Sequence, residues 1–128
     1  MPTLRPFGEL ESVVMDRLWA AGRPLTVRDV LEELHEQRPL AYTTVMTVMD
    51  NLYRKGWLTR EREGRAYHYE PSASREAYAA QLMSQAFTQA GDATATLVHF
   101  IEAMSPDEAT ALRRALGEQP GRDREGEL

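Results

Sequence analysis

The chain has 128 residues, no Cys and a formal net charge of −5, with 42% hydrophobic residues. Its length fits one compact domain or a small domain with an appendage, and the lack of Cys excludes disulfides, thiolate metal sites and Cys nucleophiles. No apolar run approaches the roughly 20 residues that span a bilayer, and the N-terminus lacks a secretory apolar core, so we expect a cytoplasmic protein without a membrane segment.

The charge is unevenly distributed along the chain. Residues 1–75 carry eleven basic and eleven acidic side chains, whereas residues 76–128 carry four basic and nine acidic ones. Between residues 54 and 65, five basic side chains accompany two acidic ones. Because nucleic-acid binding depends on the local field more than on the total, the negative net charge does not exclude a nucleic-acid partner.

Two short amphipathic helices are predicted near the N-terminus. The first spans roughly 9–20 and ends at Gly22, and the second begins at the N-cap residue Thr26, has Asp29 three positions on, and ends at Arg38 before a proline. The residues expected to face the core are Leu10, Val13, Val14 and Leu18 in the first helix, and Val27, Val30, Leu31 and Leu34 in the second.

A third helix is predicted at 42–55, with Gly56 as its stop. Its apolar face is expected to bury Val45, Val48, Met49 and Leu52. The polar face and its flanks carry Thr43, Thr44, Thr47, Asn51, Arg54 and Lys55. This face is either a recognition surface for the major groove of DNA or an ordinary solvent face. Asp50 on the same side argues against DNA, unless Arg54 at i+4 neutralises it.

A β-hairpin is predicted directly after this helix, with strands at 58–63 and 66–70 joined by Gly64 and Arg65. One interpretation is a DNA-binding wing with Arg62, Arg65 and His68 on the phosphate backbone. The alternative is a solvated edge hairpin whose charges resist aggregation. Its place after a Thr-rich helix favours the wing.

Three more helices are predicted at about 74–90, 93–104 and 105–116, and the polar segment 118–128 is predicted to be disordered. Their apolar stripes cannot all be buried on a small core around Trp19, Val30, Val48 and Leu52, which favours a symmetric dimer. The residues expected at the dimer interface are Leu82, Phe87, Leu97, Phe100, Ile101, Leu112 and Leu116.

The predicted fold class is therefore mainly α with a small β-hairpin. It comprises a winged helix-turn-helix DNA-binding domain at 1–72 and a C-terminal helical dimerisation domain at 73–117. His35, His68 and His99 stand on separate elements without metal-ligand spacing, and the chain has no catalytic motif. We expect no metal, no cofactor and no enzymatic activity.

Several segments resemble the penicillinase and methicillin-resistance repressors, the BlaI/MecI/CopY type, and especially their actinobacterial members. The motifs that carry the resemblance are GELE-x-x-VMD-x-LW at 8–19, LAYTTVMTVMDNL at 40–52, RKG-x-L-x-RER-x-GRAY-x-Y-x-P at 54–71, HF-x-E at 99–102 and SPDEA at 105–109. The resemblance implies a dimeric winged-helix repressor of a palindromic operator, with Thr43, Thr44, Thr47 and the wing arginines at the DNA. It also implies interlocked C-terminal helices.

The resemblance also bears on induction. In antibiotic-responsive members, a membrane sensor-protease signal leads to cleavage of an Asn-Phe bond in the dimerisation domain, and the matching pair here is His99-Phe100. The copper-responsive branch uses a Cys-rich motif that this chain lacks. Two other function classes stay open from the residues alone: a winged-helix module that binds another protein, and a regulator that senses a small molecule.

Overall fold

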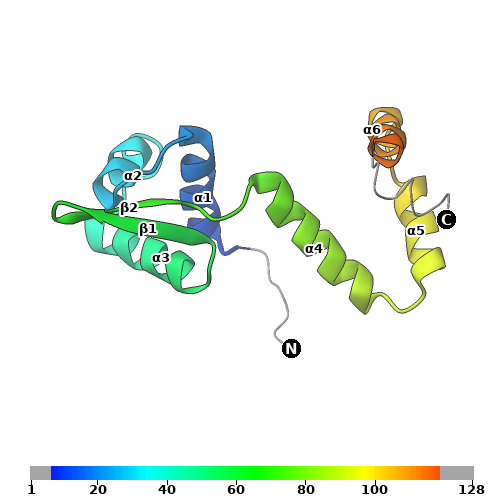
Figure 1. The fold of residues 1–128 in the computed structure, drawn as a ribbon, viewed down its shortest axis with the longest axis horizontal. Coiled ribbons are helices and arrows are strands. Elements are labelled where there is room, and N and C mark those ends of the chain that lie inside the picture. The colour runs from blue at the N-terminus through cyan, green and yellow to red at the C-terminus, as the bar shows by residue number, and fades with distance from the viewer. Residues whose placement is uncertain (1–6, 119–128) are drawn as a thin grey trace. The chain divides into compact units, whose positions relative to one another are not determined.

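The structure, a computed structural model, describes residues 7–118, so the predicted disordered tail lies outside the described residues except for Glu118. Six helices and one two-stranded antiparallel hairpin confirm the predicted fold class (Figure 1). The elements are α1 (Glu9–Ala21), α2 (Val27–Leu34), α3 (Tyr42–Arg54), β1 (Leu58–Glu63), β2 (Ala66–Pro71), α4 (Arg75–Gln89), α5 (Ala93–Glu102) and α6 (Pro106–Gly117).

The chain forms two compact units, which divide after Gln85. The sequence placed the boundary after residue 72, at the break before α4. The boundary between the compact units falls inside α4 because the first turns of this helix contact the N-terminal unit through Arg75 and Tyr78. Within residues 7–118, no helix is long and apolar enough to cross a membrane.

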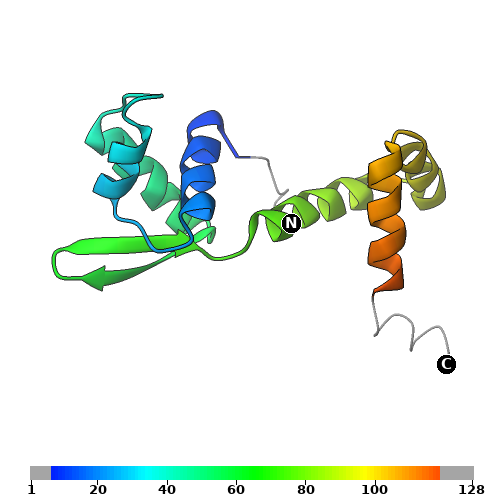
Figure 2. The ribbon, with the colours of Figure 1, turned by 90° about the horizontal axis from the view of Figure 1, so that it is seen from above.

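In the first unit, α1, α2 and α3 surround a core that the hairpin closes. The strands pair from Leu58 opposite Pro71 to Glu63 opposite Ala66, and both views show the hairpin turn projecting beyond the helices (Figures 1 and 2). Leu25 adds an isolated bridge to Tyr69, with two backbone hydrogen bonds of 2.8 Å. The hairpin is thus attached to the segment between α1 and α2.

The buried residues match the predicted core-facing sides of the helices, except that α1 is rotated about its axis relative to the prediction. Val14, Met15 and Leu18 are buried on α1, whereas Leu10 and Val13 are only half-buried, so the core-facing stripe lies further round the helix than predicted. Trp19 and Val48 pack at the edge of the core and not at its centre. The full set of buried residues is Val14, Met15, Leu18, Leu25, Val27, Val30, Leu34, Val45, Met49, Leu52, Leu58 and Tyr69.

Local capping signals explain most helix ends. Thr26 and Asp29 form a reciprocal capping box with both hydrogen bonds at 3.0 Å, and Ser105 and Glu108 form another at the start of α6. Gly22 takes up the left-handed conformation, φ 66°, that ends α1. These local signals were readable in the sequence because each involves a single glycine or two residues only three positions apart.

Two predicted helix ends were too late in the chain. α2 ends at Leu34 and not at Arg38, because the three residues after Leu34 are exposed and offer no apolar side chain to hold a further turn on the core. α5 ends at Glu102 and not at 104, with Ala103 as its C-cap.

The second unit has a different surface. Residues 86–118 contain no buried residue, and α5 exposes four large apolar side chains, each by about half of its area. The exposed large apolar residues of this unit are Phe87, Leu97, Val98, Phe100, Ile101 and Leu116. An apolar surface of this kind is unusual for a protein that acts as a monomer.

Candidate nucleic-acid interface

The outer face of α3 presents short polar side chains. Burial of Val45, Met49 and Leu52 fixes which side of the helix faces the core. The opposite side exposes Thr43 and Thr47, with Asn51 next along the helix at the same four-residue spacing. Thr44, predicted on the flank, is half-buried. The side chains form a ridge of hydroxyl, methyl and amide groups, which are groups that can read base edges in a major groove.

Asp50 lies on the same side of α3, but its negative charge is paired. Its Oδ2 is 3.0 Å from Nε of Arg54, one helical turn on, and its Oδ1 is 3.5 Å from Nη1 of Arg60 on β1. The predicted neutralisation by Arg54 is therefore present, and a second guanidinium adds to it. The carboxylate is thus compensated on both sides, which removes much of its repulsion toward phosphates.

Arg60 joins the hairpin to α3, a role that no motif in the sequence indicates. Its guanidinium lies 4.0 Å from the ring centroid of Tyr53 on α3 and 4.1 Å from that of Tyr67 on β2. A long hydrogen bond to the Tyr69 hydroxyl, 3.5 Å, accompanies this arrangement and raises the pKa of Arg60. Planar stacking between two rings suits arginine and not lysine, and it leaves this cation largely unavailable to DNA.

The two faces of the hairpin differ in charge because strand side chains alternate. Arg60 faces Tyr69 across the strands and Arg62 faces Tyr67, so arginines and tyrosines share one side. Glu61 faces His68 on the other side, with Glu63 diagonal to it. The basic side continues the exposed face of α3, to which Arg60 connects it.

The three predicted wing residues, Arg62, Arg65 and His68, therefore do not lie on one side of the hairpin. Arg62 and Arg65 are exposed, Arg65 at the turn. His68 lies on the acidic side of the hairpin, half-buried, with Nδ1 3.7 Å from a carboxylate oxygen of Glu63. The hairpin register separates His68 from Arg62. Residues on one side of this hairpin differ by an odd number across the turn, and the even difference between 62 and 68 was the signal that could have shown it.

Lys55, also predicted at the DNA, makes a structural contact. Its Nζ is 2.7 Å from Oε2 of Glu11 on α1, and this ion pair holds the end of α3 against α1. A further cation was not predicted: Arg28 on α2 lies 5.8 Å from the ring centroid of Tyr42, at the start of α3. Arg28 is exposed and so adds positive charge at the N-terminal end of the helix. No group of three or more potential ligands for a metal occurs within residues 7–118.

A three-helix core, an exposed polar ridge on its third helix and a basic hairpin fixed to that helix define a winged-helix DNA-binding domain. The penicillinase repressor family model matches residues 7–118. The chain is 48% identical over 121 residues to "Transcriptional regulator BlaI" of Mycobacterium tuberculosis, from strains CDC 1551 / Oshkosh and ATCC 25618 / H37Rv, covering 92% of this chain and 88% of each relative. The chain belongs to the penicillinase repressor family.

Solved structures agree with this assignment. The solution structure of the DNA binding domain of the repressor BlaI matches with a TM-score of 0.51 at 25% identity, over 59% of this chain and 90% of that chain. The hsRosR-S4 structure matches with a TM-score of 0.51 at 20% identity, over 84% of this chain and 94% of that one, and shows likeness of fold alone. The family confirms a DNA-binding transcriptional repressor, not an enzyme, and the M. tuberculosis relatives confirm the predicted actinobacterial resemblance.

The role of Arg60 is open to a direct test. Replacing Arg60 with Ala removes the stacked guanidinium and one partner of Asp50, so we expect hydrogen exchange of the hairpin amides to become several-fold faster while the amides of α1 change little. The matched control is Arg65→Ala, which removes an exposed arginine from the same hairpin. Equal hydrogen-exchange rates of the hairpin amides in the two variants would contradict the conclusion that Arg60 joins the hairpin to α3.

Proposed function

We propose that this protein is a dimeric repressor that acts in the cytoplasm and binds a palindromic operator. In the proposal, α3 enters the major groove and the hairpin follows the adjacent phosphate backbone. The observation that carries it is the exposed ridge of Thr43, Thr47 and Asn51, held next to the basic side of the hairpin by Arg60. The 48% identity to transcriptional regulator BlaI supports it.

Each side chain has a role that follows from its chemistry. Thr43, Thr47 and Asn51 contact base edges, where a Thr methyl meets thymine and an Asn amide meets adenine. Thr44, Arg54, Arg62 and Arg65 contact phosphates and supply the salt-dependent part of the affinity. Lys55 is paired with Glu11 and holds the end of α3 against α1, and His68 lies on the acidic side of the hairpin, so the predicted DNA contacts of these two residues are not part of this proposal.

The second unit supplies the dimer interface in this proposal. Leu97, Phe100 and Ile101 of α5 are each exposed by about half, and a second copy of the chain would cover them. Leu82, Phe87, Leu112 and Leu116 extend the same apolar surface in the sequence-based prediction, with Leu82 and Leu112 already half-buried within the chain. Two half-site contacts about 34 Å apart then act as one tight site through effective concentration.

Release is proposed to follow a signal that acts on this second unit. The His99-Phe100 bond lies inside α5, and the carbonyl of His99 accepts a hydrogen bond from the Ala103 N–H at 3.2 Å. Cleavage there, by a sensor-protease system or another protease, requires α5 to open locally. Loss of α5 packing would separate the two copies and weaken operator binding without any change in α3.

Thr47 tests the assignment of base reading. Thr47→Ala removes a hydroxyl and a methyl group from the exposed ridge, and we expect about a tenfold loss of affinity for a duplex selected from a random library, by fluorescence anisotropy, with little change for unselected duplex. Thr59→Ala, on the acidic side of the hairpin, is the matched control. An equal loss on both DNAs would remove Thr47 from the base-reading residues.

Phe100 tests the interface. Phe100→Asp places a charge in the exposed apolar side of α5, and we expect sedimentation to show monomers with weak operator affinity. Ala95→Asp adds the same charge on the opposite side of α5 and should leave the dimer intact. A Phe100→Asp variant that stays dimeric contradicts the interface assignment.

A further inference from the structure

Four aromatic rings meet beside α1, from the residue pair before α1, from α1 itself, from the residue before β1 and from α4. Phe7 stacks on Tyr78 with ring centroids 4.1 Å apart and planes at 3°, and Trp57 stands edge-on to both rings at 5.3 and 4.9 Å. Trp19 packs beside them, 6.2 Å from Phe7 and 5.9 Å from Tyr78. We call Phe7, Trp19, Trp57 and Tyr78 the aromatic latch.

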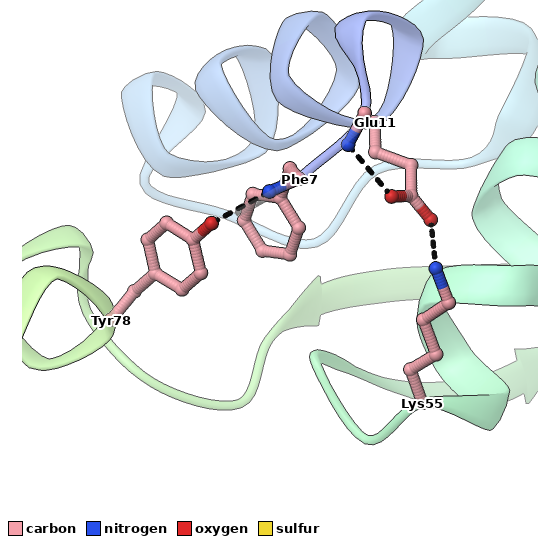
Figure 3. Close-up of polar contacts among 5 residues, drawn as sticks. Phe7, Glu11, Lys55 and Tyr78 are labelled. Carbon is pink, nitrogen blue, oxygen red and sulfur yellow. Dashed lines mark hydrogen bonds and ion pairs between the residues drawn. The ribbon is translucent and has the colours of Figure 1, made fainter. Parts of the chain in front are cut away.

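Polar contacts tie the latch to the end of α3 (Figure 3). The Phe7 N–H donates a 2.8 Å hydrogen bond to the Tyr78 hydroxyl, and the Gly8 N–H donates a 3.1 Å bond to Oε1 of Glu11. Glu11 accepts a 2.7 Å bond from Lys55 through its other oxygen. Burial alone would raise the pKa of Glu11, but the bonds from Lys55 and Gly8 outweigh it and lower that pKa. The α3 end and α4 are thus connected through five residues.

The first turn of α4 is attached by further contacts to α1. The indole N–H of Trp19 donates to the carbonyl of Ala73 at 2.9 Å, just before α4 begins. Arg75 forms a 2.8 Å ion pair with Asp16 and lies 4.9 Å from the Trp19 ring centroid. Together with Tyr78, these contacts hold the first turn of α4 against α1.

We propose that the aromatic latch positions α4 and so sets the spacing between half-sites that the dimer accepts, an inference that rests on the proposed dimeric repressor. α4 is one continuous helix of 15 residues, which makes it about 20 Å long. A tilt of about 10° at its base moves its far end by roughly 3.5 Å, close to the ~3.4 Å between successive base pairs. A small change in the packing of Tyr78 would therefore change the preferred spacing between the two half-sites by about one base pair.

A purely structural role for the latch would predict a different outcome. If the rings only stabilised the fold, loosening them would lower affinity for every spacing equally. If they position α4, loosening them broadens the range of spacings while the half-site sequence stays the same. The spacing distribution therefore distinguishes positioning from stability.

The test is selection of binding sites from a random duplex DNA library. We expect the wild-type chain to enrich two half-sites at one spacing, and Tyr78→Ala to enrich the same half-sites over at least two or three spacings. Tyr78→Phe keeps the rings but loses the bond from the Phe7 N–H, so its distribution should lie between these two. Gln81→Ala, exposed on the same helix, is the control and should match the wild type.

A second readout needs no DNA. Both tryptophans of the chain, Trp19 and Trp57, lie in the latch, so intrinsic tryptophan fluorescence reports on this cluster alone and should change in Tyr78→Ala but not in Gln81→Ala.

In the selection experiment, enrichment of only the wild-type spacing by Tyr78→Ala overturns the inference. If that variant does not fold by circular dichroism, a single spacing in Tyr78→Phe overturns it instead. If the wild-type chain itself enriches no paired half-sites, the proposed dimeric repressor fails.

Discussion

The guanidinium of Arg60 lies between the rings of Tyr53 and Tyr67 and beside the carboxylate of Asp50, and this contact connects the hairpin to α3. A two-stranded hairpin is only marginally stable by itself, so its position depends on what it packs against. With Arg60 in place, the exposed ridge of α3 and the arginines of the wing form one surface. Without it, Asp50 would keep only Arg54 as a partner and the wing would lose its main polar link to the helix.

Charge is separated within the hairpin because of strand alternation. Arg60 and Arg62 share one side with two tyrosines, whereas Glu61, Glu63 and His68 share the other. The net charge of −5 arises in residues 76–128, and within the hairpin the separation leaves one basic side next to α3. In the proposed binding mode, the acidic side chains face away from the phosphates and the basic side chains continue the polar face of α3.

Much of the fold could be predicted from the sequence because its signals are local. The three-residue spacing of Thr26 and Asp29, the helical period of Val45, Met49 and Leu52, and the turn at Gly64 each lie within a few positions. The core position of Met15 was missed because rotation of a helix by one residue depends on its tertiary partners. The early end of α2 has a local origin, since the three polar residues after Leu34 offer no apolar side chain to hold a further turn on the core.

The candidate site was predicted only in part, for a similar reason. The exposure of Thr43, Thr47 and Asn51 follows from helical period, but the pairing of Lys55 with Glu11 joins residues far apart in the chain. The hydrogen bond from Phe7 to Tyr78 joins residues 71 positions apart, and no periodic pattern in the sequence predicts a contact at that separation. The side taken by His68 was within reach, since the register across the Gly64 turn determines it.

The central claim is that α3 and the basic side of the hairpin form one DNA-binding surface. NMR titration of the isotope-labelled chain with a duplex selected from a random library tests it most directly, because backbone amides report each position separately. We expect shifts concentrated at Thr43, Thr47, Arg62 and Arg65, with Glu61 and His68 nearly unchanged. Shifts concentrated on the acidic side of the hairpin, or spread over α2 and α6 with α3 unchanged, would contradict it.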